Sequence, residues 1–330
     1  MTNTTGKEWK AYWADQARSD GEAEATTPPL PMVGGCVEND ILDQFWLSRL
    51  AQLPMQSFGD TIVLELAAGR TFPALSRMPR AGNGYLPVAL DISEDALRIG
   101  RETRDNVAVV AASVDALPFA NDSVPIILSQ FGLEYAGHQS FGEVARVLAP
   151  GGRFIAVCHY RGGALHDECA ANVRVLSDAG KTNWLDLAIV AIKLRTDMTS
   201  GRVSKAEAMT AHRTFLADFS RVEALAAAHQ LSVPAGHTLA TIVHGLMEIY
   251  NNLAAYDFET VSNWIEGRKR ELVSYQERME AMTRAALGEN DLDQIREQSS
   301  NYGMEFRFRE SLGLNDAEKP AAWGLVAHKN

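Results

Sequence analysis

Residues 61 to 91 constrain the fold more than any other stretch of the chain. An apolar run ends in Glu65 and is followed by a turn of small residues that contains Gly69, and a second apolar run, 86–90, ends in Asp91. A buried strand, a turn that lets a ligand approach the backbone and an acid at the tip of the next strand are typical of a nucleoside-binding βαβ unit. The acid matters because a ribose diol needs an acceptor with two oxygens, and a carboxylate offers them.

The turn differs from the dinucleotide-binding fingerprint. In G-x-G-x-x-G, close backbone approach and a helix N-terminus hold a pyrophosphate. Here Gly69 is the single glycine of the turn, and Thr71 stands where another glycine would fall. The pattern therefore indicates a site for a nucleoside without phosphates. In this respect the chain resembles the class I S-adenosylmethionine-dependent methyltransferases, whose first motif is an acid followed by a small, glycine-containing loop.

Composition limits the partners and the compartment. The 330 residues carry a formal net charge of -11, which disfavours nucleic acid because phosphate backbones are bound by lysine and arginine. No run approaches the ~20 apolar residues of a membrane helix, and the N-terminus lacks the apolar core of a signal peptide. The 3 scattered cysteines fit a reducing cytosol. We expect a cytoplasmic protein without a nucleic-acid or membrane partner.

Strands and helices alternate through the middle of the chain. Apolar strands are predicted at 61–66, 85–90, 107–112, 124–130 and 153–159, and helices near 72–79, 93–105 and 139–148. Short apolar strands alternating with helices predict an α/β fold: a Rossmann-like, doubly wound and mostly parallel sheet covered on both faces. Two further strands are predicted at 304–309 and 322–327. The resemblance implies that this last pair closes the sheet as a hairpin whose final strand is antiparallel.

Three regions are expected. Residues 1–60 form an N-terminal helical segment on the cofactor side, although simple packing against the sheet is an equal alternative; residues 61–162 together with 301–330 form the Rossmann-like core. Residues 163–300 have helical periodicity and form an insertion between strands five and six. The resemblance implies that this insertion shapes the acceptor pocket, and its helices are candidates for homodimer contacts.

The resemblance also assigns a cofactor site. The predicted cofactor-binding residues follow the first four strands: Glu65, Ala67, Gly69, Asp91, Ile92, Val114, Asp115, Gln130 and Phe131. Asp91 is expected to accept from the ribose diol, Glu65 to lie near the methionine moiety, and Asp115 to accept from the adenine amine. The structural alternatives are a helix-capping or turn aspartate for Asp91 and an acid that caps the turn for Glu65.

Candidate catalytic residues follow strands four and five. Methyl transfer from a sulfonium is an in-line displacement that needs alignment and exclusion of water, and a base is needed only where the acceptor must lose a proton. His159 ends strand five and is the candidate base, and Glu134 and Tyr135 are placed to touch the acceptor. The cysteines and histidines between residues 158 and 169 match no common zinc spacing, so no metal is predicted.

The predicted function is transfer of a methyl group from S-adenosyl-L-methionine to oxygen, nitrogen or sulfur of a small-molecule acceptor, leaving S-adenosyl-L-homocysteine. One alternative is a catalytically inactive methyltransferase-fold protein that binds a ligand or regulates a partner. The departures from the family pattern at Thr71 and Pro125 allow that alternative, whereas retention of the acids at the strand tips argues against it. A nicotinamide-dependent oxidoreductase is disfavoured by the single glycine.

Overall fold

The computed structural model describes residues 40–53, 61–78, 85–313 and 319–330. These residues separate into two compact units. Unit 1 contains the described residues up to Asp167 and from Ala281 onward, and unit 2 is Glu168–Glu280. Of the predicted N-terminal helical segment, residues 1–39 and 54–60 lie outside the described residues.

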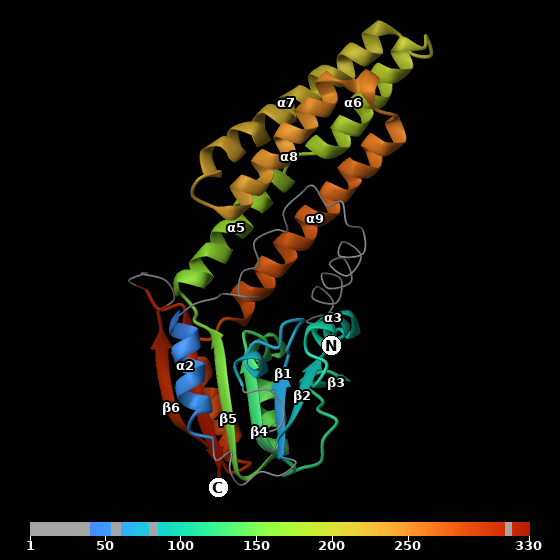
Figure 1. Cartoon of the computed structure of the whole chain (residues 1–330). Helices are drawn as coiled ribbons and strands as arrows, with labels where there is room; N and C mark the ends of the chain where they lie inside the picture. Colours follow the sequence, from blue (N-terminus) through green and yellow to red (C-terminus); the bar gives the residue numbers. More distant parts are fainter. Residues whose placement is uncertain (1–39, 54–60, 79–84, 314–318) are drawn as a thin grey trace. The chain divides into compact units, whose positions relative to one another are not determined.

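Unit 1 is built on one sheet with the strand order β3-β2-β1-β4-β5-β7-β6 (Figure 1). Its strands are β1 (Thr61–Leu66), β2 (Tyr85–Asp91), β3 (Ala108–Ala111), β4 (Val124–Gln130), β5 (Leu148–His159), β6 (Met304–Leu312) and β7 (Ala322–Lys329). Strands β1 to β5 pair in parallel, and β7 runs antiparallel to both β5 and β6. The predicted doubly wound sheet with an antiparallel last strand is confirmed. Chain order reverses between β1 and β4, and ligands of such sheets bind at the carboxyl ends of the strands at this switch point.

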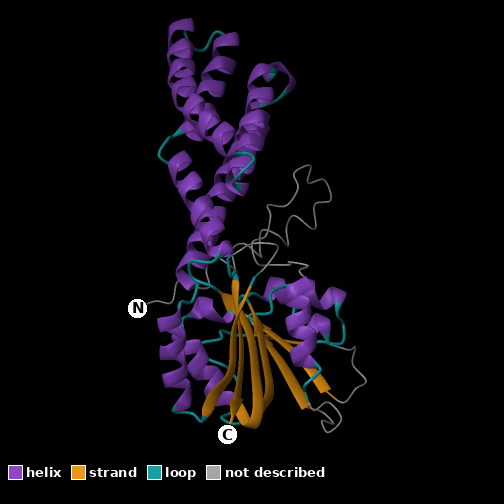
Figure 2. Cartoon of the chain, turned by 90° about the vertical axis from the view of Figure 1, so that its left-hand side faces the viewer, coloured by secondary structure: helices purple, strands orange, loops and turns teal. Residues whose placement is uncertain are grey.

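Helices cover both faces of the sheet (Figure 2). Helices α2 (Asp40–Leu50) and α3 (Glu94–Thr103) share one buried cluster with alternate residues of β1 and β4, whereas α4 (His138–Val147) and α10 (Glu289–Ser300) share the cluster on the other face. Val63 belongs to the first cluster and its neighbour Leu64 to the second. Successive strand residues point to opposite faces, so a strand buried on both sides is apolar throughout.

The connection after β1 differs from the predicted helix near 72–79. The described residues contain only a short 3-10 helix there, η2 (Leu75–Arg77). Phe72 has φ 48°, in the left-handed region, and a right-handed helix cannot run through that backbone. The helix after β2 follows the prediction, because the Ser93 hydroxyl caps α3 by accepting from the Ala96 N–H at 3.3 Å.

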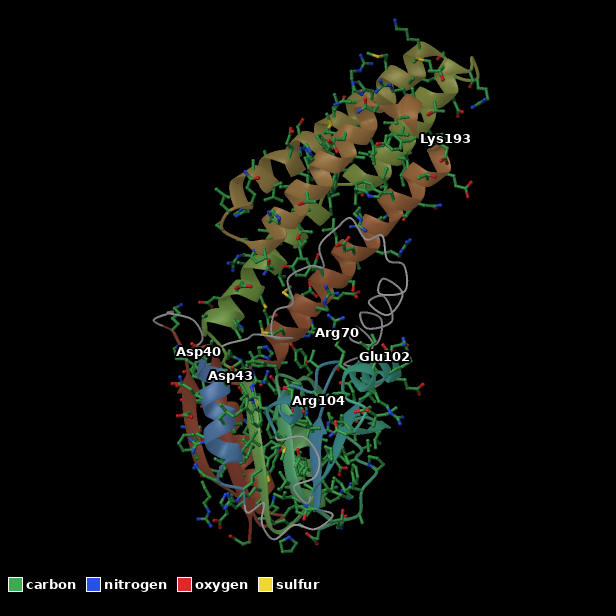
Figure 3. All side chains as sticks on the ribbon, in the orientation of Figure 1. Asp40, Asp43, Arg70, Glu102, Arg104 and Lys193 are labelled. Atoms are coloured by element: carbon green, nitrogen blue, oxygen red, sulfur yellow. The ribbon has the colours of Figure 1, made fainter. Side chains whose placement is uncertain are left out.

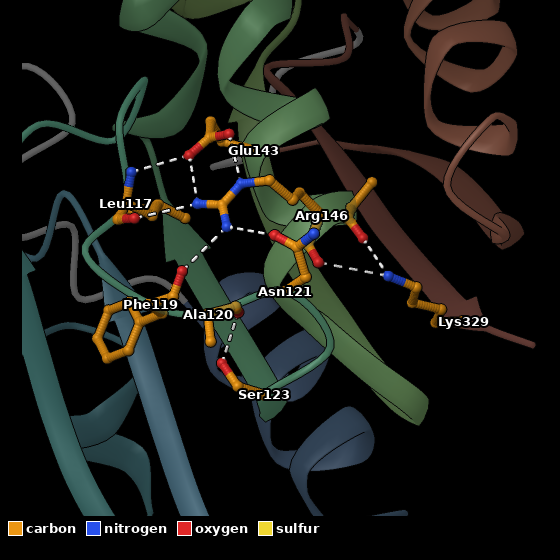
Figure 4. A network of polar contacts seen from close by, with 9 residues as sticks. Leu117, Phe119, Ala120, Asn121, Ser123, Glu143, Arg146 and Lys329 are labelled. Carbon is orange, nitrogen blue, oxygen red and sulfur yellow. Dashed lines mark hydrogen bonds and ion pairs between the residues drawn. The ribbon is translucent and has the colours of Figure 1, made fainter.

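Arg146 fixes the loop that follows β3 (Figure 4). Its guanidinium donates to the backbone carbonyls of Leu117 and Phe119, both at 3.0 Å, and to the side-chain oxygen of Asn121 at 2.8 Å. Glu143, one helical turn before Arg146, accepts from the guanidinium at 2.7 Å and from the Leu117 N–H at 2.9 Å. The loop is therefore held by a planar donor with several fixed N–H groups, which a lysine would not reproduce.

Unit 2 is helical throughout its described length. Its helices are α5 (Ala164–Gly180), α6 (Trp184–Thr199), α7 (Lys205–His229), α8 (Pro234–Asn251), the short η4 (Leu253–Ala255) and α9 (Phe258–Ala285). It interrupts the sheet between β5 and β6, as predicted, although α10 belongs to unit 1, where it packs against α4 and β6. Among the helices that the structure describes, none combines the length and the apolar character needed to cross a bilayer.

Candidate functional site

The predicted site residues lie at one edge of the unit 1 sheet. Glu65 is near the end of β1, Asp91 ends β2, Gln130 ends β4 and His159 ends β5. Parallel strands bring their carboxyl ends to the same edge, and β1, β2, β4 and β5 occupy adjacent places in the sheet. The chain thus brings together residues that are separated by up to 94 positions.

The loop after β1 is turned tightly against β2. Ala67 and Gly69 have φ angles of 49° and 57°, both in the left-handed region. The Ala68 N–H donates to the carbonyl of Leu90 at 3.1 Å, and the Gly69 N–H donates to Asp91. Small side chains are needed here because they leave the backbone open to a ligand, and glycine adopts a positive φ without the cost that alanine bears.

Asp91 is almost completely buried at the tip of β2. One carboxylate oxygen accepts from the Gly69 N–H at 2.9 Å and the other from the Ser93 N–H at 2.9 Å. Burial raises its pKa, and these backbone donors oppose that rise. A carboxylate has about four lone-pair positions, so the two remaining ones fit the two hydroxyls of a ribose. The acceptor positions that Asp91 leaves open are therefore compatible with the ribose of an adenosine cofactor.

Glu65 is fully buried, and both of its oxygens face the protein backbone. They accept from the N–H groups of Ala74 and Leu75, each at 2.8 Å. Burial raises the pKa of Glu65 to about 7, against the lowering effects of these N–H groups and of Arg77 and Arg104. Arg104, labelled in Figure 3, also donates to the Leu75 carbonyl at 2.7 Å. Glu65 thus caps the turn as the structural alternative expected, and its role beside a methionine moiety stays a prediction.

The residues predicted to surround the adenine follow β2 and β3. Ile92 and Asp115 are partly exposed, and Val114 is buried in the apolar cluster shared with α4. Val114 and Asp115 belong to the loop that Arg146 holds, whereas Ile92 lies between β2 and α3. The structure places them at the expected edge of the sheet, and their contacts with a cofactor remain predictions.

His159, Glu134 and Tyr135 come together at the tips of β4 and β5. Glu134 lies in the short helix η3 (Leu133–Ala136), and its Oε1 is 2.7 Å from Nδ1 of His159. The same oxygen accepts from the backbone N–H of His159 at 2.9 Å. The imidazole ring lies 4.5 Å from the ring of Phe131 and 5.7 Å from that of Tyr135, between centroids. Both members of the pair are buried, with His159 exposed by 1% and Glu134 by 2%.

The hydrogen bonds define the tautomer of His159. A carboxylate oxygen can only accept, so with Glu134 as a carboxylate its contact with His159 is assigned as Nδ1–H donating to Oε1. Nε2 then carries the lone pair, and among the described residues this buried atom has no hydrogen-bond partner. A buried imidazole with one nitrogen held by a carboxylate and the other unpartnered is the arrangement of a general base.

Some features of the site had no signal in the sequence. The indole N–H of Trp46 in α2 donates to Oε1 of Gln130 at 2.6 Å, across 84 positions of the chain. A Cβ atom on Gly132 would lie 2.4 Å from the Cβ of Ala67, so the loop after β4 packs against the loop after β1 only with glycine there. No local pattern in the sequence identifies Gln130 as the partner of Trp46.

No metal centre emerges from the described residues. They contain no group of three or more histidine, cysteine, aspartate or glutamate side chains that is able to hold an ion. Cys158 is fully buried, and burial together with the Glu134 carboxylate raises the pKa of its thiol well above the usual value. A thiol that stays protonated is a poor metal ligand and a poor nucleophile.

The strand order and the acids at the strand tips are typical of a nucleoside-binding α/β core, and known proteins resemble part of this core. Residues 64–156 match the family model described as methyltransferase domain. This part of the chain therefore matches a methyltransferase domain, in agreement with the resemblance to the class I S-adenosylmethionine-dependent methyltransferases that its sequence shows.

Relatives and a solved structure are similar to part of the chain. A demethylmenaquinone methyltransferase of Renibacterium salmoninarum is 32% identical over 124 residues, covering 36% of this chain and 51% of the relative. One of Mycobacterium sp. (strain KMS) is 38% identical over 120 residues, covering 36% and 49%. The crystal structure of an S-adenosylmethionine dependent methyltransferase from Mesorhizobium loti has a TM-score of 0.29 and 25% identity, covering 35% of this chain and 53% of that one. The chain spans about half the length of the curated relatives that it matches.

Proposed function

We propose that this protein transfers a methyl group from S-adenosylmethionine to a small-molecule acceptor that loses a proton during the reaction. The observation that carries the proposal is the buried Glu134–His159 pair, with Nε2 unpartnered, beside the strand tips predicted to bind the cofactor. An acceptor without an acidic proton, such as a thioether, has no proton for this pair to remove. An acceptor with a hydroxyl group needs a base to expose its nucleophile.

Each residue at the edge of the sheet then has a role. The cofactor, when bound, supplies an electrophilic methyl group on a sulfonium. Asp91 and the loop through Gly69 hold the nucleoside, and the aromatic rings of Phe131 and Tyr135 exclude water around the imidazole. His159 takes the acceptor proton at Nε2. Glu134 keeps Nδ1 protonated and stabilises the imidazolium that forms.

The acceptor class that we propose is a hydroquinone methylated at a ring carbon. Several relatives are named demethylmenaquinone methyltransferases, and one is named a ubiquinone/menaquinone biosynthesis C-methyltransferase. Removal of a hydroxyl proton raises electron density at the adjacent ring carbon, which forms the new bond to the methyl group as the bond to sulfur breaks. The ring C–H proton is lost as aromaticity returns and the oxygen takes a proton back, so one proton is released in total per methyl group. Carbon is an acceptor atom that the sequence-based prediction of oxygen, nitrogen or sulfur does not include.

Turnover with purified protein tests both parts of the proposal. Formation of S-adenosylhomocysteine with a reduced demethylnaphthoquinol, and a mass increase of one methylene in the quinone product, is the expected result. The matched control is the same quinol with both hydroxyls blocked as ethers, which gives the base no proton and is expected to be inert. Cofactor binding without turnover on any quinol would refute the acceptor class, and failure to bind the cofactor would refute the methyltransferase proposal.

A further inference from the structure

The side chain of Gln130 is held in one orientation by Trp46. Indole Nε1–H is a donor only, so the Gln130 atom 2.6 Å away is the carbonyl oxygen Oε1, and the amide orientation is fixed by chemistry. The amino group Nε2 therefore points away from Trp46. Within the described part of the chain, this amino group has no hydrogen-bond acceptor.

Trp46 is itself immobilised on the sheet. Its side chain is fully buried, and its ring meets the ring of Phe45 edge to face, with centroids 5.5 Å apart. Phe45 packs on Gly324 of β7, where a Cβ atom would lie 2.6 Å from the phenyl ring. At the start of α2, Asp43 accepts from Arg77 at 2.6 Å. A donor held by packing and an ion pair fixes the amide of its partner more firmly than a flexible side chain does.

The position of Gln130 in the sheet shows which edge and which face of the sheet its side chain occupies. Gln130 ends β4 beside the switch point, with Val157 of β5 as its partner in register. It lies on the same face of the sheet as Leu128, Phe131 and Val157, which share one apolar cluster with Trp46. Gln130 Nε2 is not among the side-chain atoms that are both buried and unpartnered in the described residues, so this amino group is accessible and is able to donate to a ligand oxygen.

We propose that Trp46 is a positioning residue that holds Gln130 so that its Nε2 amino group donates to the amino-acid carboxylate of S-adenosylmethionine. The inference rests on the proposed function, because it needs the cofactor at this edge of the sheet. A carboxylate is the group of the cofactor with the largest acceptor capacity, and the nearby acids Glu65 and Glu134 offer it no donor.

Two ligands that differ only in the carboxylate test this assignment: S-adenosylmethionine and decarboxylated S-adenosylmethionine. Calorimetric affinities of wild type, Trp46→Phe and Gln130→Glu are compared for both. Trp46→Phe is expected to weaken S-adenosylmethionine binding by about tenfold, the range of a charge-assisted hydrogen bond, and to leave the decarboxylated ligand unaffected. Gln130→Glu keeps an oxygen for the indole N–H but opposes the ligand carboxylate, so it is expected to lose S-adenosylmethionine while retaining the decarboxylated ligand.

The matched control is Trp323→Phe. That substitution also removes a buried indole N–H, which donates to the Leu287 carbonyl at 2.8 Å, but Trp323 belongs to the cluster on the other face of the sheet. It is expected to lower stability without changing the ratio of the two affinities. Equal weakening of both ligands by Trp46→Phe and Gln130→Glu would show a structural role and overturn the inference. Wild type that binds neither ligand would instead overturn the proposed function.

Discussion

The two halves of the carboxyl edge of the sheet satisfy their buried polar atoms in different ways. At the tips of β1 and β2, all four carboxylate oxygens of Glu65 and Asp91 accept from backbone N–H groups. At the tips of β4 and β5, Nε2 of Gln130 and Nε2 of His159 have no partner within the described residues.

This difference separates polar groups that have partners within the protein from polar groups whose partners are expected to be the ligands. Unpaired polar atoms in a protein interior cost free energy, so they persist where a ligand or a reacting group completes them. The acids of the β1–β2 half are already satisfied by the backbone, and they shape the loop that is predicted to receive the nucleoside. The β4–β5 half presents a donor and a base whose partners come with the reactants. Replacing Asp91 in the first half and His159 in the second should therefore separate loss of binding from loss of turnover.

The largest expected effect is on turnover, from His159→Asn. The asparagine amide is able to donate to Glu134 in place of Nδ1–H, so the buried carboxylate keeps a partner while the base is lost. Turnover is expected to fall by about 10²- to 10⁴-fold, the usual contribution of a general base. Affinity for S-adenosylhomocysteine, measured by calorimetry, is expected to stay at the wild-type value. Wild-type turnover in the variant would exclude His159 as the base.

Asp91→Ala, in the β1–β2 half, should instead weaken binding of the cofactor. It removes the acceptor for the ribose diol and leaves the N–H groups of Gly69 and Ser93 without a partner. Affinity for S-adenosylhomocysteine is expected to fall by about a hundredfold or more, because charge-assisted hydrogen bonds are lost. Asp91→Asn, which keeps one acceptor oxygen for the loop, should lose less stability than Asp91→Ala. Unchanged affinity in Asp91→Ala would mean that the nucleoside binds elsewhere.

The strand tips could be predicted from the sequence because their signals are local. Apolar runs that end in an acid and a small-residue turn identified Glu65 and Asp91 at the correct edge of the sheet. What each carboxylate binds could not be predicted, since it depends on the conformation of the loop. Glu65 accepts from the N–H groups of Ala74 and Leu75, at a turn where the structure has the short helix η2 in place of the predicted helix.

No local sequence pattern predicted which residues of different strand tips contact one another. Glu134 and His159 were both candidates, but their 2.7 Å contact depends on the pairing of β4 with β5 and on a 3-10 turn between them. The bond from Trp46 to Gln130 spans 84 positions and needs α2 on one particular face of the sheet. Such pairs follow from strand order and layer packing, which periodicity does not specify.

The pH dependence of stability should show that Glu65 contributes to structure. Burial raises its folded pKa to about 7 from an ordinary 4.5, so the folded state favours the protonated acid. The stabilisation is complete below the unfolded pKa and is lost as the pH rises through the folded pKa, a change of about 3 kcal/mol at ~1.36 kcal/mol per pKa unit. Glu65→Gln should be less stable in acid but should lack this slope. Denaturant unfolding of both proteins across this pH range measures it, and a constant difference between them would contradict the assignment.

The smallest expected effect concerns the contact between the two halves, where the loops after β1 and β4 meet. Gly132→Ala would place a Cβ atom 2.4 Å from the Cβ and 2.9 Å from the carbonyl oxygen of Ala67. Ala67 already has a positive φ and cannot easily retreat, so the overpacking should cost about 1–3 kcal/mol of unfolding free energy. Because Ala67 belongs to the loop that receives the nucleoside, affinity for S-adenosylhomocysteine should fall with it.

Gly142→Ala is the matched control for that contact. Gly142 lies within α4, and a Cβ atom there would meet nothing within 4 Å. Alanine in a helix interior is expected to stabilise the fold by roughly 0.5–1 kcal/mol and to leave ligand affinity unchanged. The opposite signs of the two glycine substitutions test whether the halves are coupled through Ala67. If both variants gain stability and bind alike, the loops tolerate a side chain and the halves act independently.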